Sequence, residues 1–200
     1  MRLSLVGFLC VTALAASTVG CVVRVRPAKE APPPPPPPPA AVVVEAPKAR
    51  RLRVFKLPEV KDNKVELPGP VLFNEDKATL KPESDAVLEL VYEYLKQTPK
   101  VTKHRVEGHT DTGGDNTHNM VLSQARAYAV AKWLVAKGID CNRLVAVGFG
   151  ETRLKITPEA TPEDRATNRR VDFVNAEIAG KAIGGLPLDG GGTIAGNVCQ

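Results

Sequence analysis

Aromatic residues are scarce in this sequence: they make up 4% of 200 residues and include a single tryptophan. A buried core must therefore consist mainly of valine, leucine, isoleucine and alanine. Roughly 130 residues between Arg51 and Ala179 are enough for one such core without disulfides or metals. The chain thus has room for one ordinary domain with additional segments on either side of it.

Histidine is also rare, since His104, His109 and His118 are the only three in the chain. His104 and His109 are five residues apart in an expected strand, so their side chains point to opposite faces. No cysteine lies near them in sequence, and their spacing matches neither a structural nor a catalytic zinc signature. We therefore expect no metal site and no cofactor.

The usual catalytic motifs are missing as well. The chain has no Gly-x-Ser-x-Gly motif, and Ser123 falls within an expected helix on the side that should be packed. Cys141 has no evident histidine partner, and Asp111 with Asp115 is weak grounds for a pair of catalytic carboxylates. The stretch "GHTDTGG" lacks the lysine of a phosphate-binding loop. The sequence therefore predicts a protein that is not an enzyme.

The net charge of +5 and pI near 9.1 are typical of chains that bind nucleic acid or an anionic surface. The first residues argue against nucleic acid. Arg2 is followed by an apolar run from Leu3 to Ala16 and then by small residues, which is the pattern of an export signal.

Three fates of this signal remain open. Processing at "TVGC" would make Cys21 a lipidated N-terminus, cleavage after "ALA" would release the chain, and an uncleaved segment would be a membrane anchor of marginal length. Lipidation of Cys21 leaves Cys141 and Cys199 as an even pair, suited to an oxidising compartment. These two could form a disulfide if the fold brings them together. We favour the lipoprotein, with residues 1–20 as its signal peptide.

Residues 21–50 have the composition of a tether. Eight consecutive prolines, Pro32 to Pro39, favour extended polyproline II geometry. At about 3.1 Å per residue, this run alone spans about 25 Å. An anchored domain needs such length if its target lies away from the membrane.

The remaining chain alternates between strand and helix patterns. We expect, in order, short strands at 64–67 and 70–73, a helix between Pro82 and Pro99, a strand at 101–108, a helix from about Thr117 to Lys137, a strand at 143–150, a short helix at 161–168 and a strand at 169–178. This order predicts an α/β sandwich, a βαβαβ-type mixed sheet with helices packed on one face. The glycine-rich tail, 180–200, is expected to be disordered unless Cys199 ties it down.

Helical details support these boundaries. Thr161 can cap the short helix, with Pro162 in its first turn and Asp164 at the capping-box position. The stripe of the long helix expected to face the sheet consists of Ser123, Ala127, Val130 and Leu134.

The stretch "VEGHTDTGGDNTHN", residues 106–119, begins the best candidate site, which continues along the following helix. Asp111 lies on a glycine-bracketed loop after a strand, and Asn119, Leu122 and Arg126 follow along one side of the next helix. A carboxylate facing a guanidinium across a groove suits a ligand that carries an ammonium and a carboxylate. The alternative is that Asp111 and Arg126 simply form an ion pair, and spacing alone favours it.

Three stretches, "VEGHTDTGGDNTHNMVLSQARAYAVAKWLVAKGI", "VAVGFGE" and "RATNRRVDF", resemble the peptidoglycan-binding domain of outer-membrane protein A and the peptidoglycan-associated lipoprotein. The resemblance covers about Lys64 to Ile178. It implies that Asp111 and Arg126 clamp the diaminopimelate of the peptide stem without covalent attachment. It also implies groove-lining positions at Thr110, Asn119 and Leu122, with Arg170 as a supporting residue and Arg169 as a weaker candidate for that role.

The resemblance extends to "VLFNEDKATL", where Asp76 matches the family's groove-edge aspartate. Glu75 departs from the family, which usually has an aromatic or apolar residue at this position of the loop. His109 belongs to the "GHTD" run, in which the family's histidine has a structural role.

These observations together predict a non-catalytic outer-membrane lipoprotein that faces the periplasm and anchors the outer membrane to the cell wall. Its expected parts are a signal peptide at 1–20, the lipidated Cys21 and tether at 21–50, an OmpA-like domain at 51–179, and the tail at 180–200. The expected partners are peptidoglycan, the outer membrane through its lipid, and other envelope proteins, without nucleic acid. The alternatives are an inner-membrane stator or secretion component with the same domain, and a cell-wall hydrolase.

Overall fold

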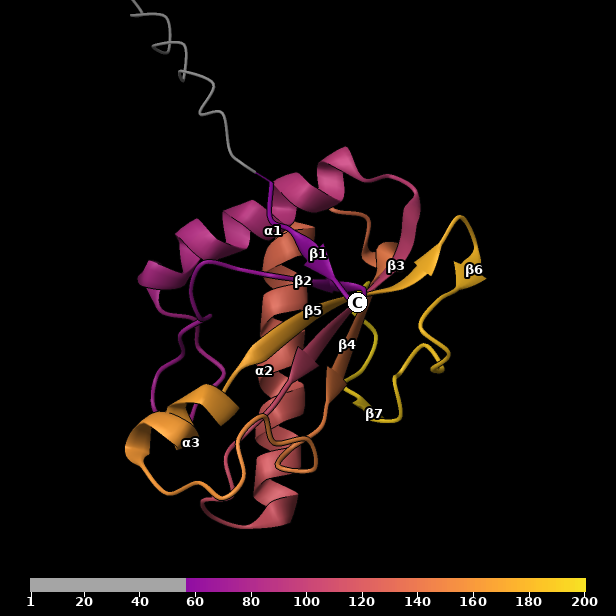
Figure 1. The fold of residues 1–200 in the computed structure, drawn as a ribbon. Helices are drawn as coiled ribbons and strands as arrows, with labels where there is room; N and C mark the ends of the chain where they lie inside the picture. The colour runs from indigo at the N-terminus through magenta and orange to yellow at the C-terminus, as the bar shows by residue number, and fades with distance from the viewer. Residues whose placement is uncertain (1–56) are drawn as a thin grey trace, which may run out of the picture. The chain divides into compact units, whose positions relative to one another are not determined.

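Two long helices pack on one face of a mixed β-sheet (Figure 1). The computed structural model describes residues 57–200. The expected signal peptide, Cys21 and the proline-rich tether lie outside the described residues. Within the described part, no helix has the length and apolar character needed to cross a membrane.

Seven strands form the sheet, in the order β1-β2-β5-β3-β4-β7, with β6 paired to β5. The strands are β1 (Val60–Lys61), β2 (Lys64–Val65), β3 (Val101–Gly108), β4 (Leu144–Gly148), β5 (Val171–Ile178), β6 (Lys181–Ala182) and β7 (Thr193–Ile194). The central strand β3 runs parallel to β4 and antiparallel to β5. The open mixed sheet confirms the predicted fold class.

The helices begin and end where the sequence predicts. A 3-10 turn, Pro82–Ser84, leads into α1 (Asp85–Gln97), and α2 spans Asn116–Ala136. Asp115 caps α2 by accepting hydrogen bonds from the backbone of Thr117 and His118. The short helix α3 (Pro162–Asn168) has the predicted capping box of Thr161 and Asp164.

The core lies between the helices and the sheet. The predicted stripe of α2, Ser123, Ala127, Val130 and Leu134, is completely buried. The apolar members of this stripe pack with Val106, Ala146 and Phe173 of the sheet and with the buried side of α1. Gly108 allows this close contact, because a side chain there would overlap the Ser123 carbonyl. The end of β3 and the first turns of α2 are therefore held close together.

The C-terminal segment covers part of the other face of the sheet. Gly192 packs against Val147 and Phe149, two buried side chains outside the main core. Nearby, Arg105 donates to the carbonyls of Pro187 and Leu188, both at 3.2 Å. The strand β7 then extends the sheet by pairing antiparallel with β4.

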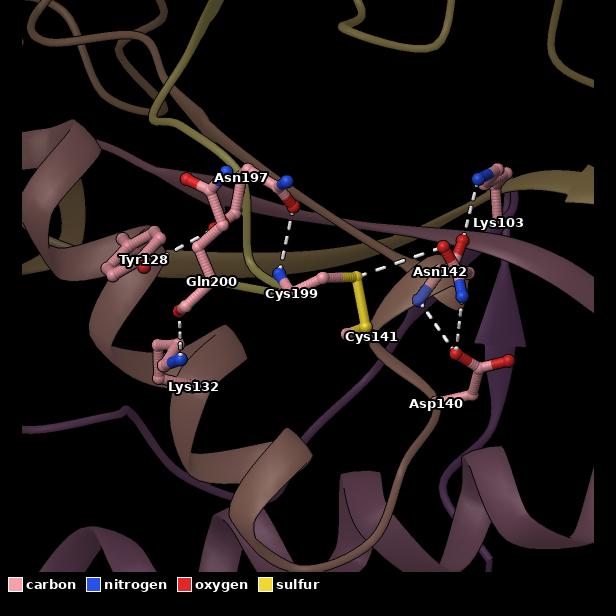
Figure 2. The surroundings of a disulfide bond; sticks show 9 residues. All are labelled: Lys103, Tyr128, Lys132, Asp140, Cys141, Asn142, Asn197, Cys199 and Gln200. Carbon is pink, nitrogen blue, oxygen red and sulfur yellow. Dashed lines mark hydrogen bonds between the residues drawn. A yellow bond between two sulfur atoms is a disulfide. The ribbon is translucent and has the colours of Figure 1, made fainter.

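A disulfide between Cys141 and Cys199 fastens the end of this segment (Figure 2). Val198 is buried in the main core, and the nitrogen of Lys132 on α2 donates to the backbone oxygen of Gln200 at 2.6 Å. The tail is ordered, which is the case that the sequence allowed for if Cys199 ties it down. Residues 180–200 belong to the same compact unit as the preceding domain.

Candidate functional site

A groove with two hollows lies between α2, the loop after β3, the loop before α1 and the end of α3. The larger hollow has a volume of about 570 Å³ and the smaller about 320 Å³. Four charged residues line both: Asp76, Asp111, Arg126 and Arg169. The remaining lining of the smaller hollow includes Thr110, His118, Asn119 and Leu122. All predicted ligand-binding residues except Arg170 therefore line one continuous groove.

Asp111 is held by its own loop and by an arginine. One carboxylate oxygen accepts from the backbone of Gly113 at 3.2 Å, and the other accepts from Arg169 Nη1 at 2.5 Å. The Asp111 side chain is 15% exposed, whereas that of Arg169 is 45% exposed. The ion pair of Asp111 is thus with Arg169, and the simple Asp111–Arg126 pair considered from sequence spacing does not form.

Arg126 presents its guanidinium to the groove. Its Nε donates to the Lys77 carbonyl at 3.1 Å, and the guanidinium lies over the Phe73 ring, 5.2 Å from its centroid. Among the described residues, no side chain or carbonyl accepts a hydrogen bond from its two terminal nitrogens. Burial, and then the positive charge of Arg169, lower the pKa of Arg126. A partly buried guanidinium with free donors favours an anionic ligand group.

Asn119 fixes the loop that carries Asp111. Its side-chain nitrogen donates to the Gly113 carbonyl at 3.0 Å and to Glu151 Oε2 at 2.9 Å, and the residue is only 3% exposed. Thr110 is also buried, and its hydroxyl has no hydrogen-bond partner within residues 57–200. Leu122 is half-buried on the same side of α2 and supplies apolar surface between the charges.

Asp76 and His118 contact each other at the edge of the smaller hollow. His118 Nε2 lies 2.6 Å from Asp76 Oδ1. The backbone of Asp76 has φ of 49°, a left-handed conformation that is uncommon for aspartate. Sequence reasoning missed this contact of His118, because 42 residues separate the two side chains.

The two adjacent arginines before β5 point in different directions. Arg170 donates to Asp172 Oδ2 at 2.9 Å and to the Arg153 carbonyl at 3.1 Å, and it lines neither hollow. Arg169 lines both hollows. Neighbouring residues in extended chain alternate in direction. The structure therefore places the predicted weaker candidate, Arg169, in the groove, and Arg170 within a buried ion network.

His109 belongs to that ion network. Its ring stacks on Phe149 with centroids 5.2 Å apart, and its Nε2 lies 3.7 Å from carboxylate oxygens of both Glu107 and Asp172. Burial lowers the pKa of His109, which favours the neutral ring.

In residues 57–200, the network residues Glu107, His109 and Asp172 are the one group arranged so that it could hold a metal ion. The carboxylates already pair with cations: Glu107 with Arg105 at 2.5 Å, and Asp172 with Lys64 at 2.8 Å and Arg170 at 2.9 Å. Since these cations already offset both negative charges, a buried divalent ion would be electrostatically disfavoured. The group therefore holds Arg170 and His109 together at the ends of β5 and β3.

Residues 72–169 match the model of the OmpA family. The chain is 42% identical over 113 residues to outer membrane porin F of Pseudomonas aeruginosa, covering 56% of this chain and 31% of the porin. It is 40% identical over 106 residues to peptidoglycan-binding protein ArfA of Mycobacterium bovis, covering 53% of this chain and 32% of ArfA.

A third relative is the probable lipoprotein YiaD of Escherichia coli. It is 40% identical over 109 residues, which cover 54% of this chain and 49% of YiaD. The chain therefore spans between about a third and a half of the length of these three relatives.

Proposed function

Because residues 72–169 belong to the OmpA family, we propose that this chain binds peptidoglycan through the groove between Asp111 and Arg126. The ligand group is the diaminopimelate of the peptide stem, held without a covalent bond. One observation carries this proposal: Asp111 and Arg126 line the same hollow, and the terminal nitrogens of Arg126 have no partner in the described chain. The name of the relative ArfA supports the choice of polymer.

Each charge has a distinct role in the proposed complex. The guanidinium of Arg126 donates two parallel hydrogen bonds to the ligand carboxylate, while carboxylates of Asp111 and Asp76 accept from its ammonium. Arg169, already paired with Asp111, holds that carboxylate in its orientation toward the groove. Leu122 contacts the aliphatic chain between the two charged ends.

The binding should be weak at each site and reversible. A hydrogen bond to a charged group contributes about 1.5 to 3 kcal/mol, and less where water reaches it. Retention on the wall then depends on many copies that face a polymer with repeated stems. We propose that the groove binds its ligand without catalysis, in keeping with the OmpA-family match.

The same proposal includes an outer-membrane lipid anchor at Cys21. The similarity to the probable lipoprotein YiaD supports it, as does the small-residue stretch before Cys21. In this arrangement the proline-rich tether at 21–50 connects the lipid to the domain. Stable anchoring needs about two acyl chains, which a lipidated N-terminal cysteine supplies.

Titration with soluble stem peptides tests the ligand class. A stem that contains diaminopimelate should bind the full chain in a saturable manner. A matched stem with lysine lacks the side-chain carboxylate, so Arg126 loses its partner. We expect this stem to bind at least about tenfold more weakly. Equal affinity for the two stems would contradict the proposed role of Arg126.

A further inference from the structure

The contact between His118 and Asp76 closes the smaller hollow on one side. His118 Nε2 and Asp76 Oδ1 are 2.6 Å apart, and both residues line that hollow. Their side chains are 53% and 66% exposed, so a ligand can reach both of them. The pair thus lies where an incoming ammonium group would meet Asp76.

The backbones that carry these two side chains are fixed. His118 lies in the first turn of α2, and its backbone nitrogen donates to the capping carboxylate of Asp115 at 3.0 Å. The loop of Asp76 is attached to α2 through the hydrogen bond from Arg126 to the Lys77 carbonyl. Rotation of exposed side chains alone can therefore open or close the contact, without movement of either element.

We propose that His118 competes with the ligand's ammonium group for Asp76 and so makes binding sensitive to pH. The proposal rests on the proposed function of the groove. Histidine gains a proton as the pH falls below neutrality, and an imidazolium binds a carboxylate more strongly than a neutral ring does. Acidification therefore favours the internal contact over the ligand, and binding weakens.

Other charged side chains lie in the hollow or beside it, near the same imidazole. Asp115 belongs to the same turn of α2, Asp111 comes from the loop after β3, Arg126 from α2 and Arg169 from the chain before β5. Asp76 is the one in direct contact with the imidazole.

The test compares variants of the full chain at about pH 7.5 and about pH 5.5, with a soluble diaminopimelate stem as the probe. The wild type should bind about two- to fivefold more weakly at the lower pH, the range expected for an exposed ion pair. His118→Gln is the matched variant, because its amide can still donate to Asp76 but cannot gain a charge. This decrease should be absent in His118→Gln, and His118→Ala should bind at the lower pH at least as tightly as wild type.

Two results would overturn the competition. One is a His118→Gln chain whose stem binding decreases at the lower pH as much as that of the wild type. The other is weaker binding by His118→Ala than by wild type at both pH values. The second result would make His118 a ligand contact instead of a competitor. Failure of the proposed function itself looks different, because the wild type would then bind the stem at neither pH.

Discussion

At the scale of single residues, two adjacent arginines have different partners and so different roles at the groove. Arg169 is half exposed and orients Asp111, whereas Arg170 is mostly buried against Asp172. Loss of Arg170 leaves the buried Asp172 with Lys64 as its remaining cation partner. The two arginines should therefore differ in whether their loss affects binding or folding.

Arg170→Ala should lower the free energy of unfolding by about 2 kcal/mol or more, since it breaks a buried ion pair. Arg169→Ala is its control and should change stability by no more than about 0.5 kcal/mol while weakening stem binding. Urea denaturation and stem titration measure the two effects. Equal stability losses in the two variants would show that the buried network does not distinguish them.

A buried histidine makes stability depend on pH. Burial lowers the pKa of His104 to about 4, although its Nδ1 donates to Asn175 Oδ1 at 3.0 Å. In the unfolded chain a histidine has a pKa of about 6.5, so the unfolded state takes up the proton first as pH falls. The contribution of His104 is complete above about pH 6.5 and is lost between that value and about pH 4.

The wild type should lose about 3 kcal/mol of stability through His104 over this interval. His104→Gln cannot be protonated, so its unfolding free energy should fall less between the same two pH values. Urea denaturation at several pH values measures the difference. Parallel curves for the two proteins would show that His104 does not titrate differently in the folded state.

Sequence reasoning at the residue scale succeeded where partners are close along the chain. Asp111, Asn119, Leu122 and Arg126 lie within one loop and helix, and they line one hollow as predicted. The role of His118 was not found, because its partner Asp76 approaches only through the tertiary fold. Which arginine of the pair enters the groove depends on where the chain becomes extended, a detail that the sequence does not specify.

At the scale of elements, long periodic segments were predictable and short edge strands were not. The bounds of β3 match the expected strand at 101–108, and α2 agrees within one residue at each end. The two-residue strands β6 and β7 show no period that a pattern could reveal. β6 pairs with β5 through a two-residue turn, Ala179–Gly180, in which both residues have positive φ. β7 lies in the C-terminal segment that the disulfide and Val198 hold against the sheet.

Loss of the disulfide should increase the local opening of the C-terminal segment more than that of the groove. Cys141 and Cys199 are 58 residues apart, so removal of the bond should lower the free energy of unfolding by about 2 to 4 kcal/mol. Cys199→Ser should also speed amide exchange in β7 and along the facing edge of β4. Hydrogen exchange and urea denaturation measure these effects.

The double variant Cys141→Ser/Cys199→Ser and the reduced wild type are the matched controls. Both should behave like Cys199→Ser, because each lacks the same bond. Unchanged exchange in β7 would mean that the other contacts of the segment hold it without the disulfide.

At the scale of the whole molecule, the proposal joins a lipid, a tether and a wall-binding domain. The first two parts lie outside the described residues, so the sequence and the similarity to YiaD are their support. Mass spectrometry of the mature protein should show an N-terminal Cys21 that carries acyl chains. An intact Met1 would contradict the lipid anchor and favour a retained inner-membrane segment.

A wall-binding module should leave its polymer intact. Zymography on purified sacculi, with metal added and with metal chelated, should therefore show no clearing by the full chain. Clearing under either condition would contradict the binding module and indicate a cell-wall hydrolase.

Cosedimentation with purified sacculi tests the central claim most directly. The full wild-type chain should pellet, whereas Asp111→Ala and Arg126→Ala should each remain in the supernatant with an unchanged circular dichroism spectrum. Glu83→Ala and Lys100→Ala remove exposed charges of the same signs outside the groove lining, and both should pellet like the wild type. Wild-type pelleting by both groove variants would contradict the account and leave Asp111 and Arg126 with structural roles alone.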